Sequence, residues 1–328
     1  MASLPARPLC GGTRRRVPAR IEPPAVAGVR RGTARLNAGG VPLGERLRLG
    51  WLGITGATEA LLTYSSPAQR RLLRDLRAAL GRRELEIHYQ PIVELPSGRA
   101  HTVEALVRWN HPDRGLLWPP DFLPQAELGD VMGDIDTQVL EGALGQQRRW
   151  SEEGLELAVA VNMSGACLTR WFPREVERQL RVSGVAPGNL MLELTEGALM
   201  ANPVVATEVM GSLSRMGVKL SIDDFGTGYS SLARLAALPF DQVKIDKSFL
   251  RGDDQGTLRV VRAITNLSHD LGRSVVLEGV ERETTWRQAI DLECDFAQGY
   301  GICPPLDPRT LAAPLARLAR EPSGLRFP

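Results

Sequence analysis

The sequence predicts an α/β fold, a TIM-like (β/α)₈ barrel, preceded by an Arg-rich N-terminal extension that is disordered or weakly ordered. Two observations support the barrel: eight short apolar segments recur after residue 66, and helical stretches separate them. Several segments are nearly continuous apolar runs, as expected of strands covered on both faces. Eight strands alternating with helices over about 250 residues favour a closed barrel, and a doubly wound open sheet is the alternative.

Residues 1–65 are the predicted extension, or the remnant of a linker. They are rich in Arg, Gly and Pro and lack sustained hydrophobic periodicity, which is typical of segments that bury too little apolar surface to fold. Residues 1–66 contain ten Arg and three Glu, a formal charge of +7. A basic arm that contacts nucleic acid or an anionic membrane is the functional alternative.

The rest of the chain is mildly acidic, because the net charge of all 328 residues is only +2. An acidic domain does not attract duplex nucleic acid in general, so specific cations would have to hold a phosphate ligand. The four Cys residues show neither metal-ligand spacing nor a disulfide framework, which fits a reducing compartment. No apolar run is long enough to span a membrane, and no secretory signal is visible. We therefore expect a cytoplasmic protein without a membrane span.

A helix is predicted to open the folded domain, which we place at residues 66–322. Ser66 and Pro67 are typical of a helix start, leucines recur on one face of the following stretch, and Gly81 is predicted to end the helix. The predicted strands then follow at 85–93, 101–109, 157–164, 190–196, 218–226, 241–249, 274–281 and 295–302.

Each predicted strand carries a carboxylate, amide or cation at or near its C-terminal end. One such residue alone would be interpreted as a capping or solvated group. Eight in step favour a shared site, because barrel active sites are built at that end of the strands. In strand order the residues are Gln90, Glu104 with Arg108, Asn162, Glu193 with Glu196, Asp223 with Asp224, Lys244, Glu278 and Gln298.

The residue types at these strand ends indicate a site for hard divalent cations. The carboxylates and the amide oxygen of Asn162 form an all-oxygen set, which suits Mg²⁺ or Mn²⁺ and disfavours a structural zinc. Without cations the carboxylates would repel one another. Asp223 and Asp224 could hold two ions about 3.5–4 Å apart, the arrangement used for in-line displacement at phosphorus. Ca²⁺ prefers longer bonds, so we expect it to occupy the site and to inhibit turnover.

The neighbouring pair Asp223 and Asp224 raises a geometric question, because adjacent side chains in a strand point to opposite faces. Both can converge on one object only where the strand ends and the backbone turns away. Gly226 and Gly228, which follow directly, would permit that turn.

Several segments resemble, in order and in spacing, the signatures of the EAL-domain phosphodiesterases. The resemblance covers roughly residues 68–308 and implies the EAL variant of the (β/α)₈ barrel. It also implies hydrolysis of the bacterial second messenger cyclic di-GMP to linear 5′-pGpG, dependence on two Mg²⁺ or Mn²⁺ ions, and a homodimer. The matching segments are HYQPIV (88–93), EALVRW (104–109), VNMS (161–164), LELTE (192–196), DDFGTGYSSL (223–232), VKIDKSF (243–249), LEGVE (277–281) and QGY (298–300).

The resemblance also implies metal ligands. One ion would be bound by Glu104, Asn162, Glu193 and Asp223, and the other by Asp223, Asp224 and Glu278.

Catalytic and substrate-binding roles follow from the same resemblance. Lys244 would hold the attacking water or stabilise charge on the phosphoryl oxygens, and Glu278 is the candidate general base or its near partner. Glu196 would order the loop that starts at Asp223, and Glu104 belongs to the catalytic set through its metal. The implied substrate contacts are Gln90, Leu106, Arg108 and Gln298.

Three departures from the family pattern affect the rim and the packing, and they leave the implied metal ligands and Lys244 in place. Pro304 stands where the family commonly has Arg, Leu277 and Arg282 replace the usual Ala and Thr, and Gln138 replaces a common Trp.

Two other functions remain as alternatives. A catalytically silent cyclic di-GMP receptor would keep Arg108 and the glutamines and lose metal ligands, so the complete ligand set argues against it. A different metal-dependent phosphodiesterase on the same barrel is the second alternative. The stretch 63–80 weakly resembles the linker between a GGDEF cyclase domain and an EAL domain, so an unknown sensor or a GGDEF domain is an expected partner.

Overall fold

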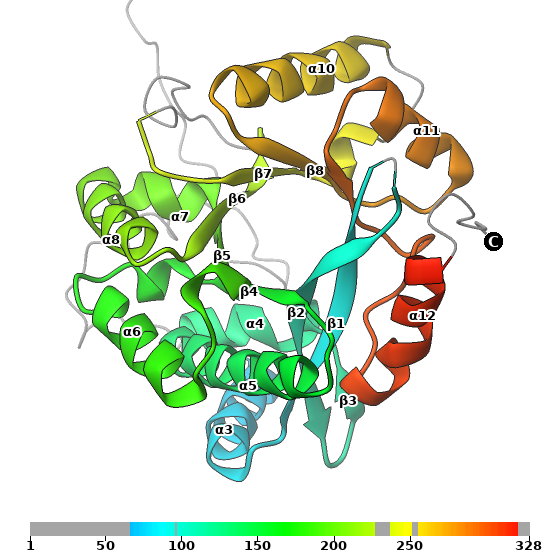
Figure 1. The fold of residues 1–328 in the computed structure, drawn as a ribbon. Coiled ribbons are helices and arrows are strands. Elements are labelled where there is room, and N and C mark those ends of the chain that lie inside the picture. Colours follow the sequence, from blue (N-terminus) through cyan, green and yellow to red (C-terminus); the bar gives the residue numbers. More distant parts are fainter. Residues whose placement is uncertain (1–65, 96, 227–236, 251–254, 321–328) are drawn as a thin grey trace, which may run out of the picture. The chain divides into compact units, whose positions relative to one another are not determined.

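A computed structural model of the chain describes residues 66–95, 97–226, 237–250 and 255–320. Its strands form a ring that helices surround (Figure 1). The predicted N-terminal extension lies outside the described residues. None of the helices in the described ranges is long and apolar enough to cross a membrane.

The strands of the described residues form one nine-stranded sheet in the order β1-β9-β8-β7-β6-β5-β4-β2-β3, and β1 also pairs with β2. The β1–β2 pairing closes the ring and leaves β3 outside it, paired with β2 alone. The predicted barrel is therefore confirmed, and the open sheet is excluded. The strands are β1 (Leu85–Glu94), β2 (Ala100–His111), β3 (Gly115–Leu117), β4 (Ala158–Met163), β5 (Leu190–Thr195), β6 (Lys219–Phe225), β7 (Gln242–Ile245), β8 (Ser274–Leu277) and β9 (Phe296–Ala297).

Strand β1 runs antiparallel to both of its neighbours in the ring, β2 and β9, whereas the other neighbouring ring strands pair in parallel. The link from β1 to β2 is too short for a crossover, so only antiparallel pairing is possible. This pairing places Gln90 directly opposite Glu104. The prediction that Gln90 stands at the C-terminal end of its strand was wrong, because it lies in the middle of β1.

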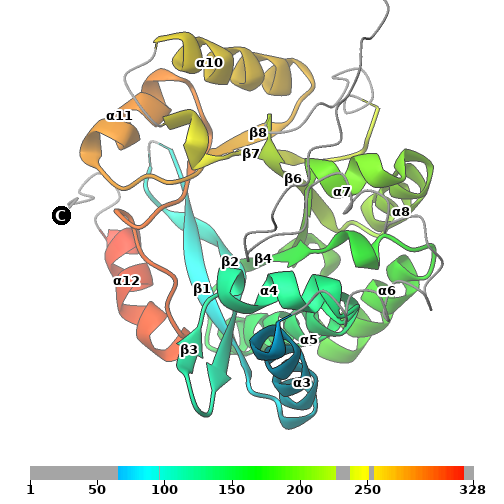
Figure 2. The ribbon, with the colours of Figure 1, turned by 180° about the vertical axis from the view of Figure 1, so that it is seen from behind.

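Amphipathic helices cover the outside of the ring (Figures 1 and 2). In α6, for example, Phe172, Val176 and Leu180 recur every fourth residue and are all buried. The helices are α3 (Pro67–Arg82), α4 (Pro119–Leu128), α5 (Met132–Glu152), α6 (Phe172–Ser183), α7 (Glu196–Ala201), α8 (Pro203–Arg215), α10 (Gln255–Asp270), α11 (Glu283–Asp291) and α12 (Pro308–Arg320).

The first helix, α3, begins where the sequence predicts and ends two residues later. Ser66 Oγ accepts a hydrogen bond from the Gln69 amide at 3.2 Å, and Gln69 Oε1 accepts one from the Ser66 amide at 2.8 Å. This reciprocal capping box fixes the start. Gly81 was predicted to end the helix, but Arg83 does so with φ of 56°, and its amide bonds to the carbonyl of Ala79. Gln138 covers this end by donating to the Leu80 carbonyl at 3.0 Å.

An apolar layer closes the barrel beneath the predicted site. Ile92, Ala160 and Val276 form a separate buried cluster, with Met191 and Phe296 packed against it. Each of the five lies two positions from a predicted site residue on its strand or directly after it, as Ala160 does from Asn162. Because side chains alternate with a period of two, both members of each pair face the interior. The strand period therefore places a layer of polar side chains next to a layer of apolar side chains inside the barrel.

Candidate active site

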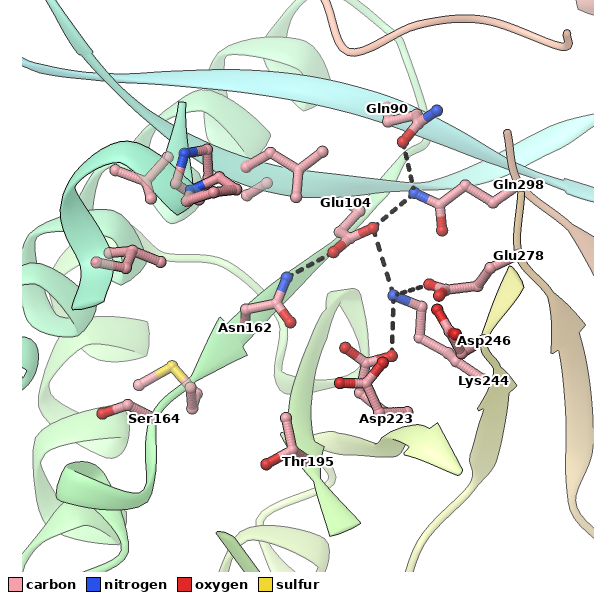
Figure 3. A pocket seen from close by; sticks show the side chains of 18 of the residues that line it. Gln90, Glu104, Asn162, Ser164, Thr195, Asp223, Lys244, Asp246, Glu278 and Gln298 are labelled. Carbon is pink, nitrogen blue, oxygen red and sulfur yellow. Dashed lines mark hydrogen bonds and ion pairs between the residues drawn. The ribbon is translucent and has the colours of Figure 1, made fainter. Parts of the chain in front are cut away.

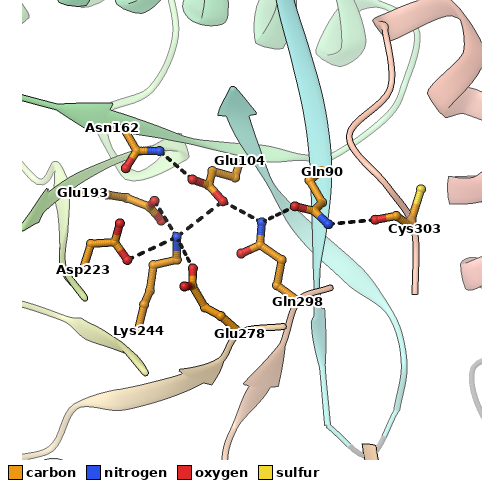
Figure 4. A network of polar contacts seen from close by, with 9 residues as sticks. All are labelled: Gln90, Glu104, Asn162, Glu193, Asp223, Lys244, Glu278, Gln298 and Cys303. Carbon is orange, nitrogen blue, oxygen red and sulfur yellow. Dashed lines mark hydrogen bonds and ion pairs between the residues drawn. The ribbon is translucent and has the colours of Figure 1, made fainter. Parts of the chain in front are cut away.

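The predicted polar residues converge at one end of the barrel, and each comes from a different strand or from the residue after it (Figures 3 and 4). Parallel pairing aligns the ends of β4, β5 and β6, so Asn162 pairs with Glu193 in register. The residues that meet are Gln90, Glu104, Asn162, Glu193, Asp223, Lys244, Glu278 and Gln298.

Lys244 lies at the centre of this group and is 1% exposed. Its Nζ donates a hydrogen bond to Glu193 Oε2 at 2.9 Å and lies 2.8 Å from Glu278 Oε1. It is 3.4 Å from Glu104 Oε2 and 3.6 Å from Asp223 Oδ1. Burial alone would lower the pKa of Lys244, but the four carboxylates outweigh burial and hold the pKa well above its ordinary value. Lys244 is therefore a constant positive charge in the site.

Both oxygens of Glu104 accept a hydrogen bond from a side-chain amide. Asn162 Nδ2 donates to Oε1 at 2.5 Å, and Gln298 Nε2 donates to Oε2 at 2.6 Å. Burial would raise the pKa of Glu104, but Lys244 and these hydrogen bonds bring it below its ordinary value. Because Asn162 uses its amide nitrogen on Glu104, its carbonyl oxygen remains for a cation.

Burial raises the pKa values of two further carboxylates in the site, Glu193 and Glu278. Burial raises the pKa of Glu193 well above its ordinary value. The negative charges of Glu104 and Asp223 raise it further, and the positive charge of Lys244 only partly offsets this rise. Burial also raises the pKa of Glu278, to about 7. Within the described ranges, Glu193 Oε1 and Asp223 Oδ1 are buried and accept no hydrogen bond. Carboxylate oxygens that accept no hydrogen bond fit the ligand chemistry of a divalent cation.

Asp223 and Asp224 converge through a bulge within β6. The register with β7 shifts between Ile222 and Phe225, and Asp224 has φ of 54° in the left-handed region. The strand continues to Phe225, so the bulge, rather than a turn after the strand, brings the pair together. Ligand oxygens of Asp223, Asp224 and Glu278 lie within 4.8 Å of one another. These three carboxylates are a candidate metal site.

Glu196 begins α7 and holds the backbone just beyond that bulge. It is buried, and its Oε2 accepts a hydrogen bond from the Gly226 amide at 3.0 Å. Gly226 has φ of 89°, and a Cβ there would lie 2.9 Å from the ring of Phe249, so only glycine fits. This hydrogen bond to Gly226 is a contact by which Glu196 would order the loop that starts at Asp223. Thr227 and Gly228 lie outside the described residues.

We expect Glu196→Gln to weaken metal binding. The substitution replaces a charge-assisted hydrogen bond with a neutral one and loosens the backbone after Asp224. The Mn²⁺ concentration for half-maximal activity should rise by about 10-fold, with partial recovery at saturating Mn²⁺. Glu208→Gln, at a surface ion pair with Arg170, is the control and should change nothing. An unaltered Mn²⁺ dependence in Glu196→Gln would show that Glu196 is an ordinary strand-end carboxylate.

All of the converging polar residues except Glu193 line the floor of a cavity of about 880 Å³, a size typical of small-molecule sites. One wall is apolar, and charged residues and an exposed tyrosine stand at the mouth. The apolar wall includes Leu106, Pro119, Leu123, Ile135 and Val139, and the mouth includes Glu127, Lys247, Glu281 and Tyr300.

The predicted substrate residues lie around this cavity in two ways. Gln90, Leu106 and Gln298 line it directly. Arg108 is only 2% exposed, and its guanidinium stacks on the ring of Trp118, 4.1 Å from the centroid. Its Nη1 donates to the Val107 carbonyl at 2.8 Å, and its Nε is buried and has no partner among the described residues. Arg108 itself does not line the cavity, although its neighbour Val107 does, and the stack on Trp118 holds the guanidinium in this position.

Sequence reasoning missed Asp136, a buried carboxylate of α5 that lines the same cavity. Its Oδ2 accepts hydrogen bonds from the amide and the hydroxyl of Ser164, at 3.0 and 2.6 Å, and from Cys167 Sγ at 3.1 Å. Burial raises the pKa of Asp136. The available signal was a charged residue within the apolar stripe that Val139 and Leu140 continue.

A sequence model of the EAL domain matches residues 73–305, which is well over half of the chain and includes every site residue named above. The chain belongs to the EAL domain family. The resemblance noted in the sequence is therefore confirmed, and so is the expectation of a barrel of this kind.

Relatives of this EAL domain include two proteins of Pseudomonas aeruginosa, NbdA and MucR. The cyclic di-GMP phosphodiesterase NbdA is 40% identical over 270 residues, which cover 81% of this chain and 34% of NbdA. The bifunctional diguanylate cyclase/cyclic di-GMP phosphodiesterase MucR is 38% identical over 262 residues, which cover 79% of this chain and 38% of MucR. The chain therefore spans little more than a third of the length of these relatives.

Solved structures of EAL domains share this fold. The PaMucR phosphodiesterase in complex with c-di-GMP has a TM-score of 0.71 and 39% identity, covering 74% of this chain and 99% of that one. The EAL enzyme Bd1971, bound to cAMP and cyclic di-GMP, has a TM-score of 0.72 and 29% identity, covering 83% and 73%. EAL domains generally use divalent metals, and the carboxylates of Asp223, Asp224 and Glu278 suit such ions.

Proposed function

We propose that this EAL domain hydrolyses cyclic di-GMP to linear 5′-pGpG and so lowers the cellular level of the messenger. The observation that carries the proposal is the set of candidate metal ligands gathered at one cavity, where four of their carboxylates surround Lys244 and all but Glu193 line the cavity. The substrate is suggested by the relatives NbdA and MucR and by the c-di-GMP in the PaMucR complex. A protein that only binds the ligand would not need four carboxylates around one buried lysine.

Two groups of side chains would hold the ions. Mg²⁺ or Mn²⁺ bound there would act as a Lewis acid on the phosphoryl group and would lower the pKa of a bound water. Two features fit such ions: all of the donor atoms are oxygens, and one buried oxygen each of Glu193 and Asp223 accepts no hydrogen bond from the described residues. The first group is Glu104, Asn162, Glu193 and Asp223. The second is Asp223, Asp224 and Glu278, whose oxygens lie within 4.8 Å of one another.

The remaining work falls to residues that orient the water and the phosphate. Lys244 Nζ lies beside Glu278, so it can hold the attacking water and balance charge on the phosphoryl oxygens. Glu278, with a pKa of about 7, can take the proton of that water. Arg108, which stacks on Trp118 and follows the lining residue Val107, would bind a phosphate oxygen.

Incubating the purified protein with cyclic di-GMP and Mn²⁺, followed by chromatography, tests the proposal. We expect pGpG in Mn²⁺ or Mg²⁺, and none in excess chelator or in Ca²⁺ alone. Ca²⁺ should still permit ligand binding, because it fills a carboxylate site with looser geometry. Full turnover in Ca²⁺ alone would contradict the two-metal arrangement, and tight binding without pGpG in Mn²⁺ would support a receptor.

Metal binding is expected to release protons near neutral pH. The pKa of Glu278 is about 7, so this group is partly protonated near neutral pH in the metal-free protein, and a cation displaces that proton. Burial raises the pKa of Glu193 as well. The apparent Mn²⁺ affinity should therefore increase as the pH rises toward neutrality. Calorimetric titration in two buffers with different ionisation enthalpies measures the release. Glu278→Gln should reduce it, and an equal release would contradict this assignment.

A further inference from the structure

A chain of buried hydrogen bonds leads from Glu104 away from the site (Figure 4). Gln298 Nε2 donates to Glu104 Oε2 at 2.6 Å and to Gln90 Oε1 at 3.1 Å. Gln90 Nε2 in turn donates to the Cys303 carbonyl at 2.9 Å. Gln90 and Gln298 are 6% and 4% exposed, so water does not compete for these bonds.

This series of hydrogen bonds ends at the segment Cys303–Leu306, which we call the strap. It connects the barrel to α12, and β1 holds it in place. Leu306 forms an antiparallel bridge with Tyr89, the residue before Gln90, through backbone hydrogen bonds of 2.7 and 3.0 Å. The strap is therefore bonded to the backbone of Tyr89 and to the side chain of Gln90. Gln90 also pairs with Glu104 across strands β1 and β2.

We propose that Gln90 is a positioning residue that acts on the metal site through Gln298 and Glu104, and that the strap is part of this support. The inference rests on the proposed role of Glu104 as a metal ligand. The amide of Gln298 has two protons, and it uses one on Glu104 and one on Gln90. Gln90 thus fixes the plane of the Gln298 amide, and that plane fixes one oxygen of Glu104.

The same geometry limits direct contact between Gln90 and a ligand. Its carbonyl oxygen accepts from Gln298, and its amide nitrogen donates to Cys303, so binding a substrate would mean breaking one of these bonds. The acceptor left over in the pair is Gln298 Oε1, which is buried and has no partner among the described residues. The two glutamines therefore have different tasks: Gln298 can face a ligand, and Gln90 supports Gln298.

Direct metal binding by the variant Gln90→Met tests this inference. Methionine preserves the length of the side chain and removes both hydrogen bonds. We expect calorimetry to show about 10-fold weaker Mn²⁺ binding in the absence of substrate. At saturating Mn²⁺ the KM for cyclic di-GMP should change by less than about twofold, because the ligand contact is unchanged. A KM raised 10-fold or more with unaltered Mn²⁺ binding would overturn the inference and make Gln90 a substrate contact.

Gln147→Met is the matched control. Gln147 is also a buried glutamine whose Nε2 donates to a backbone carbonyl, that of Leu157 at 3.1 Å, but it lies on α5 away from the cavity floor. The variant Gln147→Met should lower the melting temperature about as much as Gln90→Met does, and it should leave Mn²⁺ binding unchanged. Equal Mn²⁺ affinities in the two variants would reduce Gln90 to a structural role. Because Mn²⁺ binding is measured without turnover, the test keeps its meaning even if wild-type protein makes no pGpG.

Discussion

Asp223→Asn is expected to reduce the turnover of cyclic di-GMP by on the order of 10²–10³-fold while ligand binding remains measurable. Asp223 is the one carboxylate that belongs to both proposed metal groups, and its Oδ1 is buried without a hydrogen bond from the described residues. Asparagine has the same shape, but it removes the negative charge that would bridge two cations. Chromatography of pGpG in Mn²⁺ measures turnover, and calorimetry in Ca²⁺ measures binding.

Two further variants separate chemistry from binding. Arg108→Ala should weaken ligand binding by about 1–3 kcal/mol, because it removes the proposed phosphate contact, which substrate and transition state would share. Asp241→Asn is the control for the exchange of Asp for Asn. Asp241 precedes β7 at the opposite end of the barrel, where it pairs with Lys219, so turnover should be unchanged. If the wild-type protein binds cyclic di-GMP but makes no pGpG, and Asp223→Asn binds the ligand with equal affinity, the protein is a receptor and not an enzyme.

The barrel was predictable from sequence because each strand leaves a strong local signal. Apolar runs such as LAVAVNMS end in a polar residue, and the strand period of two then places Asn162 and Ala160 on the same inward face. Strand direction leaves no such signal. The antiparallel direction of β1 follows from the short link between β1 and β2. Because that direction was not predicted, the cross-strand pairing of Gln90 with Glu104 was not predicted either.

The members of the candidate site were predictable, but their geometry was not. Spacing alone brings Asp223 and Asp224 to the end of β6, but it cannot show that a left-handed residue within the strand turns the second carboxylate toward the first. The stack of Arg108 on Trp118 joins β2 to the residue before α4, and the bonds of Asp136 join α5 to the end of β4. Such pairs depend on how helices pack on the barrel, and one sequence carries no direct record of that packing.

Lys244→Met is the second substitution with a large expected effect, and here the change is in stability as well as activity. Removing the cation leaves Glu104, Glu193, Asp223 and Glu278 without a positive partner in a buried site. Breaking a buried ion pair in this way destabilises a protein by about 3–5 kcal/mol. Turnover should also fall by orders of magnitude, because no other described cation lies on the cavity floor.

The pH and metal dependence of that loss show whether charge is the cause. Without Lys244 the carboxylates bind protons more tightly in the folded protein than in the unfolded chain, so the variant should lose further stability as the pH rises through neutrality. Mn²⁺ should restore much of the melting temperature, because it supplies the missing charge, but it should not restore turnover. Lys219→Met, at an exposed pair with Asp241, should change stability by only about 0–1 kcal/mol under every condition. If Lys244→Met is as stable in chelator as in Mn²⁺, the lysine does not neutralise the carboxylates, and a role in catalysis alone would remain.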